Sequence, residues 1–184
     1  MPWSRFRIRS NHMTTTFVSG AALIIGAAAC VTDLHSRRIP NWLTFGATAA
    51  AFAAHYAYGG PEAARHAASG WITGLFLFMP LFLLGGMGAG DVKLLAALGA
   101  WLGPTGAFWL ALYSSMAGGV MALAIAFHHG YLATAFRNLG ALGRFWWTFG
   151  PRPMAALTLE KATAPKLAYA VPMFLGVLVT LWLR

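Results

Sequence analysis

Long apolar runs separated by short polar breaks dominate this chain. The runs lack the apolar-polar alternation that marks the strands of a membrane barrel. They predict helices, because a helix satisfies its own backbone hydrogen bonds inside lipid. The expected spans cover residues 16–32, 42–58, 69–84, 91–102, 105–127 and 166–183. The pattern therefore predicts an all-α, polytopic membrane bundle of about six transmembrane helices.

The polar breaks carry turn residues. They lie at 33–41, 59–68, 85–90 and 103–104. Pro40 suits the first turn of a new helix and disfavours helical backbone at Ile39. The third break is a glycine cluster, and Gly103-Pro104 predicts a turn. The chain shows no internal repeat and no low-complexity linker, so we expect one integral membrane domain, residues 1–184.

Two stretches lie outside the expected spans. Residues 128–165 form the longest polar stretch, in which arginines alternate with the aromatic group Phe145-Trp146-Trp147. Basic residues mixed with tryptophan favour a cytoplasmic loop with a helix lying in the membrane interface. Residues 1–12 are basic and have three alternatives: a signal-peptide n-region, a disordered start, or a segment that precedes a true start at Met13.

Composition agrees with a membrane protein. Hydrophobic residues make up 59% of the chain and charged residues 9%, whereas soluble domains carry roughly 25% charged residues. The net charge of +9 favours cytoplasmic loops and anionic lipid headgroups, and no nucleic-acid partner is expected. Cys30 is the only cysteine, which excludes an intramolecular disulfide and a multi-cysteine zinc site.

Lysine and arginine counts predict the orientation. With the segment after the first span in the cytoplasm, eight basic residues lie inside and five outside, a modest bias in the expected direction. The eight are Arg37, Arg38, Lys93, Arg137, Arg144, Arg152, Lys161 and Lys166, and the five are Arg5, Arg7, Arg9, Arg65 and Arg184. This orientation places Asp33 and Asp91 at cytoplasmic ends of spans.

Two of the four acids in the chain lie beside apolar runs. Asp33 ends the first run and Asp91 begins the fourth, and an ionisable group at membrane depth is expected to be functional. Peptide hydrolysis by an aspartate pair needs one carboxylate to take a proton from water and a protonated partner to polarise the scissile carbonyl. We therefore expect Asp33 and Asp91 to converge as a catalytic pair.

Each acid also has a structural alternative. Asp91 suits the N-cap of the fourth helix, and Asp33 suits a solvated span end. The glycines before Asp91 favour the catalytic interpretation. We expect Gly88 and Gly90 to adopt backbone dihedrals closed to other residues and to leave space beside the carboxylate for an extended peptide.

The segments around both acids resemble a known family. Gly88-Ala89-Gly90-Asp91, followed by Val-Lys-Leu, is a GxGD motif. The segment Asp33-Leu34-His35-Ser36-Arg37-Arg38-Ile39-Pro40-Asn41 looks like the other aspartate segment of prepilin peptidases. The chain is most similar to the short form found in tight-adherence (Flp, type IVb) pilus systems. Presenilin and signal peptide peptidase share GxGD but carry Pro-Ala-Leu, which Pro165-Lys166-Leu167 does not match.

The resemblance implies an aspartic endopeptidase of the bacterial inner membrane. It would remove the basic N-terminal leader of a prepilin or pseudopilin at the cytoplasmic face, using no metal or organic cofactor. Asp33 and Asp91 match the catalytic acids, and Gly88, Gly90 and Lys93 match the motif. Lys93 could lower the pKa of a nearby carboxylate or, slightly favoured, reach lipid headgroups. The partners would be the prepilin leader and helix and the bilayer, with the oligomeric state left open.

Two departures from the family refine this expectation. The long family members carry a methyltransferase region with paired cysteines, which Cys30 alone does not match, so we expect cleavage without N-methylation. A Pro-Tyr-Ala stretch before the last span is here Ala168-Tyr169-Ala170, so a kink expected there is absent or moved to Pro172.

Two other functions fit the same sequence. A small proton-coupled transporter would use Asp91 as its proton site, with Asp91 and Lys93 facing a pore, and has no need of Asp33. A non-enzymatic subunit of a pilus or secretion assembly would need neither acid.

Overall fold

The computed structural model describes residues 3–153 and 167–183, and every regular element in these residues is a helix. The helices are α1 (Trp3–Ser36), α2 (Asn41–Leu83), α3 (Ala89–His128), α4 (Leu132–Phe149) and α5 (Ala170–Trp182). Three of them contain segments long and apolar enough to cross a membrane: Thr16–Ser36, Asn41–Leu83 and Ala89–His128. α5 is a shorter apolar helix. The all-α prediction is confirmed.

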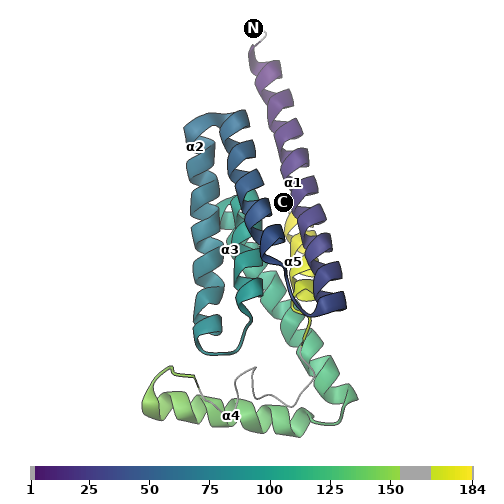
Figure 1. The fold of residues 1–184 in the computed structure, drawn as a ribbon, viewed down its shortest axis with the longest axis vertical. Coiled ribbons are helices and arrows are strands. Elements are labelled where there is room, and N and C mark those ends of the chain that lie inside the picture. Colours follow the sequence, from purple (N-terminus) through teal and green to yellow (C-terminus); the bar gives the residue numbers. More distant parts are fainter. Residues whose placement is uncertain (1–2, 154–166, 184) are drawn as a thin grey trace.

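Two glycines interrupt the long helices. Gly60 has φ 67° in α2 and Gly103 has φ 73° in α3, and a proline follows each of them. Only glycine adopts this left-handed backbone readily, and proline suits the first turn of the helix that follows. α2 therefore rises and returns as two arms, and α3 does the same (Figure 1). The turn predicted at Gly103-Pro104 is confirmed.

The expected polar break at 59–68 is different in the structure. Helix continues from Pro61 through this segment, so the second arm of α2 begins well before residue 69. Proline is suited to that first turn, and Glu62 forms an ion pair with Arg65 one turn later. Alanines fill most of the remaining positions, and alanine has the highest helix propensity. The polar composition of residues 59–68 therefore did not show where the helix is interrupted, which is at Gly60 alone.

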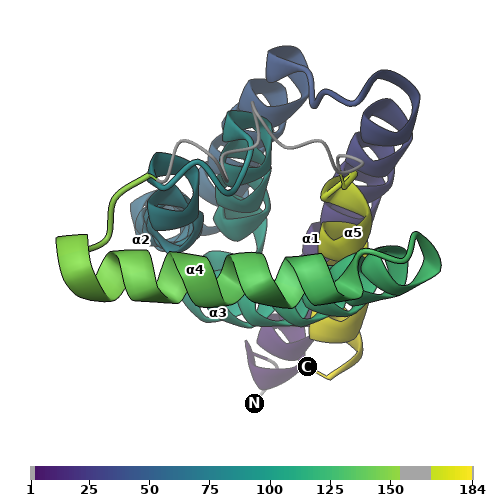
Figure 2. The same cartoon turned by 90° about the horizontal axis from the view of Figure 1, so that it is seen from below.

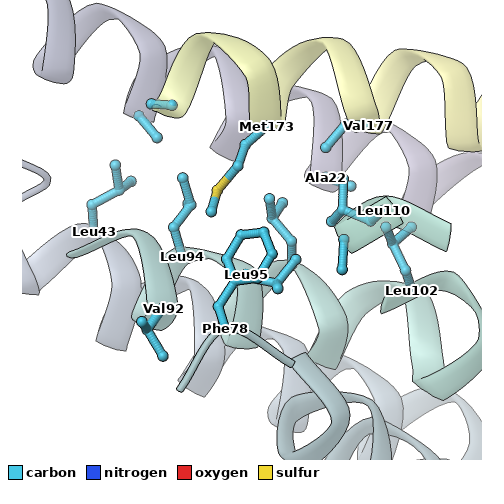
Figure 3. Packing of buried hydrophobic residues seen from close by; sticks show 14 of the residues in the cluster. Ala22, Leu43, Phe78, Val92, Leu94, Leu95, Leu102, Leu110, Met173 and Val177 are labelled. Atoms are coloured by element: carbon cyan, nitrogen blue, oxygen red, sulfur yellow. The ribbon is translucent and has the colours of Figure 1, made fainter. Parts of the chain in front are cut away.

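The apolar core lies between α1, α2, α3 and α5. Leu94, Leu95 and Leu98 of α3 are fully buried, and Met173 of α5 points toward Leu94 and Phe78 (Figure 3). α2 and α3 approach until their backbones touch, because a Cβ added at Gly74 would lie only 2.5 Å from the carbonyl oxygen of Leu95. Small residues permit this kind of close contact between membrane helices.

α4 crosses the end of the bundle at which α1 ends and α3 and α5 begin (Figures 1 and 2). None of its residues is buried, and Trp147 is 93% exposed. A helix lying in the membrane interface is expected within residues 128–165, and α4 confirms a helix there, running across the bundle rather than along it. Lys161, Lys166 and the rest of 154–166 lie outside the described residues.

Candidate active site

Asp33 lies near the C-terminal end of α1, with its side chain inside the bundle. It is 7% exposed, and it is the one ionisable residue among the buried polar residues of the described chain. Its Oδ2 accepts a hydrogen bond from the backbone N–H of Ala170, with an N···O distance of 3.1 Å. The solvated alternative for Asp33 is therefore wrong. The nearby His35 is exposed, so nothing indicates that it orients the buried Asp33 carboxyl group.

α1 ends just after Asp33. The N–H of Arg37 donates to the carbonyl oxygen of Asp33 at 2.8 Å, and Arg37 has φ 54°. A residue in the left-handed region commonly ends a helix, although glycine usually occupies this place. Pro40 then precedes α2 as its N-cap residue, with extended backbone, one position before the first turn in which it was expected. This tight connection keeps Asp33 within the last turn of α1.

Asp91 lies in the first turn of α3 and is partly exposed. The N-cap of α3 is Gly88, which makes no side-chain cap. The Asp91 carboxyl accepts a hydrogen bond from the backbone of Gly88, an arrangement similar to the reciprocal bond of a capping box. Asp91 therefore supports the start of the helix without being its N-cap, and the simple capping alternative does not describe it.

The two acids come together in space. They are 58 positions apart in the chain, yet their carboxyl groups lie close enough to interact electrostatically. α1 brings Asp33 to this point from one direction, and α3 starts there with Asp91. The fold therefore gathers both acids at the end of the bundle where α1 ends and α3 begins.

The motif glycines act through space and not through unusual backbone dihedrals. Gly88 has ordinary extended backbone, φ −79° and ψ 147°, and Gly90 has no positive φ, so the expected special dihedrals are wrong. A Cβ at Gly88 would lie 3.1 Å from Oδ2 of Asp91, and one at Gly90 would lie 3.3 Å from Cβ of Ile39. The first glycine leaves room for the carboxyl group, and the second lets the α1–α2 connection pack against α3.

Lys93 contacts that same connection. Its Nζ donates to Oδ1 of Asn41 at 3.0 Å and lies 5.3 Å from the ring centroid of Phe45. Both contacts belong to the start of α2, and neither involves an aspartate. Lys93 therefore holds the first turns of α2 and α3 together.

The N-terminal end of α5 makes a contact that no sequence pattern indicates. Ala170 is fully buried and provides the N–H that reaches Asp33, and its neighbour Tyr169 lies near Asp91. The Ala-Tyr-Ala stretch was considered only for a kink. Pro172 lies in the first turn of α5, where proline is tolerated without bending a helix. A backbone donor has no side-chain signature, so only the position before the last apolar run could have suggested it.

The donor set fits acid-base chemistry. Among the side chains of residues 16–153 and 167–183, no group of three or more His, Cys, Asp or Glu could hold a metal ion. What the site offers is a pair of interacting carboxyl groups at one end of an apolar bundle, one buried and one partly exposed. Such a pair can deprotonate a water molecule with one group and donate a proton with the other.

Comparisons with known proteins agree on one group of enzymes. Residues 20–123, which include both aspartates, match the Type IV leader peptidase family. The chain is also 33% identical over 113 residues to a type 4 prepilin-like proteins leader peptide-processing enzyme from Escherichia coli. That match covers 56% of this chain and 42% of the relative, so the chain spans well under half of that protein. No solved structure matches the chain.

Proposed function

The chain belongs to the type IV leader peptidase family, and from this we propose that it is a membrane aspartic endopeptidase that cleaves the basic leader from prepilins. Asp33 and Asp91 would be its two catalytic acids. The observation that carries the proposal is the meeting of these carboxyl groups at the end of the bundle. The E. coli relative, by its name, processes leader peptides of type 4 prepilin-like proteins, which supports the same class of substrate here.

The chemistry follows from the pair. One carboxylate takes a proton from a water molecule, and the resulting hydroxide attacks the carbonyl carbon of the scissile peptide bond. The other carboxyl group, protonated, donates a hydrogen bond to the carbonyl oxygen and stabilises the negative charge that develops there. The tetrahedral intermediate then collapses: the C–N bond breaks, and the first carboxyl group passes the proton it took from water to the departing amine. Partial exposure of Asp91 supports entry of water, while burial of Asp33 strengthens its electrostatic interactions.

The arrangement of the helices supports a site at one membrane surface. We propose six crossings: α1, the two arms of α2, the two arms of α3, and α5. α1 ends, shortly after Asp33, and α3 begins, with Asp91 in its first turn, at the end of the bundle that also carries α4 (Figure 1). Arg37 and Lys93 lie beside the two acids, and Arg137 and Arg144 lie on α4. By the positive-inside rule this end faces the cytoplasm, and the prepilin's apolar helix would dock laterally from the bilayer.

The finer expectations rest on the resemblance. The substrate would be a Flp-type prepilin or pseudopilin, cut just before its hydrophobic helix. The new N-terminus would stay unmethylated, as the resemblance to the short form of the family implies. Mass spectrometry of the mature pilin made by this chain tests the second point directly. An added methyl group on the mature N-terminus would refute it.

The decisive experiment is co-expression with a tagged Flp-type prepilin. Asp33→Asn and Asp91→Asn should each abolish the size shift of the pilin, at unchanged enzyme level. Glu62→Gln is the matched control, because it makes the same chemical change in an exposed acid that pairs with Arg65. Full cleavage by either aspartate variant would remove the pair from the mechanism.

Both alternatives are tested in the same set. A proton-coupled transporter would use Asp91 alone, yet here Asp91 interacts with Asp33, and Lys93 contacts Asn41. Proton flux in vesicles that depends on Asp91 but not on Asp33 would favour the transporter. Normal pilus assembly with both aspartate variants would favour a non-enzymatic subunit.

A further inference from the structure

The first turn of α5 contacts the surroundings of both acids. The N–H of Ala170 donates to Oδ2 of Asp33, and the Tyr169 side chain lies near Asp91. α5 supplies neither aspartate, and its start lies 137 positions from Asp33 in the chain. The turn is therefore a third component of the site, separate from the two helices that carry the acids.

The hydrogen bond to Asp33 satisfies both of its partners. Ala170 is the first residue of α5, and the first N–H groups of a helix have no acceptor within it. The next N–H, that of Val171, finds the carbonyl oxygen of Ala168 at 3.1 Å, whereas that of Ala170 finds a buried carboxyl group. Neither Ala170 nor Asp33 has ready access to water, so losing the bond would leave a buried donor and a buried acceptor unpaired.

The Tyr169 side chain anchors this turn against α2 and α3, and so sets how far into the bundle the Ala170 N–H reaches. Its ring packs edge-on against Phe78 of α2 with centroids 5.8 Å apart, and its hydroxyl donates to the carbonyl oxygen of Ser114 in α3 at 3.4 Å. A Cβ at Gly118 would lie only 2.8 Å from the ring, so a glycine is needed there. At Gly119, one position on, an added Cβ would meet nothing within 4 Å.

We propose that the Tyr169–Ala170 turn is a positioning element for the aspartate pair. The Ala170 N–H holds Oδ2 of Asp33, so the carboxyl group keeps one orientation toward Asp91, and the Tyr169 ring sets the depth at which that N–H sits. The proposal rests on the proposed peptidase function. Neither residue needs to touch the substrate, so their loss should lower kcat and leave KM unchanged.

A backbone ester is the direct test. Replacing Ala170 by its α-hydroxy acid analogue removes the N–H and keeps the methyl side chain. With a detergent-solubilised Flp-type prepilin as substrate, kcat should fall by about ten- to a hundred-fold, since misplacement of a catalytic group by about 1 Å has an effect of this size. The same ester at Val171 is the matched control, because it removes a hydrogen bond of the same turn that does not reach Asp33. It should stay within about three-fold of wild type.

A pair of ordinary variants tests the same element without chemical synthesis. Gly118→Ala should push the Tyr169 ring aside and lower kcat by about ten-fold at unchanged KM. Gly119→Ala, made in the same helix one residue later, should behave as wild type. If the Ala170 ester does not accumulate as folded protein, the comparison of Gly118→Ala with Gly119→Ala tests the proposal.

Three results would overturn the proposal: equal rates for the two esters, equal rates for the two glycine variants, or a loss that appears in KM. The last would make the turn a substrate contact. These failures are distinguishable from failure of the function itself. If the proposed peptidase function were wrong, Asp33→Asn would retain cleavage. If only the positioning proposal were wrong, Asp33→Asn would be inactive while the Ala170 ester cleaved at the wild-type rate.

Discussion

Gly74→Ala should disturb the site from a distance. The added Cβ would lie 2.5 Å from the carbonyl oxygen of Leu95 and 2.9 Å from Cα of Ala96, and both neighbours are backbone atoms that no side-chain rotation can move. Ordinary contact begins at 3.4 Å, so α2 and α3 must separate locally by about 0.9 Å. Leu95 lies one helical turn after Asp91, so the carboxyl group of Asp91 should move with it.

Two effects on stability oppose each other in this variant. Alanine gains about 1 kcal/mol over glycine in a helix, and overpacking costs about 1–3 kcal/mol. We expect the free energy of unfolding to fall by about 0–2 kcal/mol, and the cleavage rate to fall on the order of a hundred-fold, since a shift of about 1 Å can have that effect. A thermal melt and a prepilin cleavage time course on the same detergent-purified sample measure both quantities.

Gly46→Ala is the matched control for that experiment. It lies in the other arm of α2, it is exposed, and an added Cβ meets nothing within 4 Å. It should gain the same helix propensity and cleave at the wild-type rate. If Gly74→Ala proved as stable and as active as Gly46→Ala, the close α2–α3 contact would not be what places Asp91.

Three further predictions concern single contacts. Gly88→Ala should fold normally, because its backbone suits any residue, but it should cleave about ten-fold more slowly since its Cβ crowds Asp91. Gly103→Ala should lower the melting temperature, by left-handed strain of about 1–2 kcal/mol and by overlap with His66; adding His66→Ala should relieve only the overlap. Lys93→Met and Asn41→Leu should each cost about 0.5–1.5 kcal/mol of stability, and a double-mutant cycle should show that the double variant costs no more than either single one.

The parts of this site that could be predicted from sequence are those with side-chain signatures. An acid beside an apolar run is unusual enough to single out, so the sequence predicts Asp33 and Asp91 as candidates, and it predicts their convergence because one chemistry needs both. The helices were predictable in the same way, because long apolar runs are a signature carried by side chains. The segment after Gly60 was misjudged because its charges pair along the helix, Glu62 with Arg65, instead of ending it.

What sequence could not supply is contact made by backbone or by absent atoms. The role of Gly88 was assigned to dihedral freedom, because that is what glycine most often provides, while the structure uses the missing Cβ as space. Every residue except proline carries the same backbone N–H group, so no sequence pattern could mark that of Ala170 as the partner of Asp33. Such features emerge only when the helices are placed together.

The division of the site among three helices has a consequence for how mutations act. Asp33 is held by α5 through Ala170, and α5 is in turn held by α2 and α3 through Phe78 and Ser114. By the prediction for Gly74→Ala, the position of Asp91 depends on the close approach of α2 and α3. A change at any of these helix contacts therefore alters the distance between the two carboxyl groups before it unfolds the bundle, because packed helices shift by fractions of an ångström at a cost of about 1–3 kcal/mol. Variants of this chain should accordingly lose cleavage at small losses of stability, and a series of glycine-to-alanine changes at the contacts should show activity falling more steeply than melting temperature.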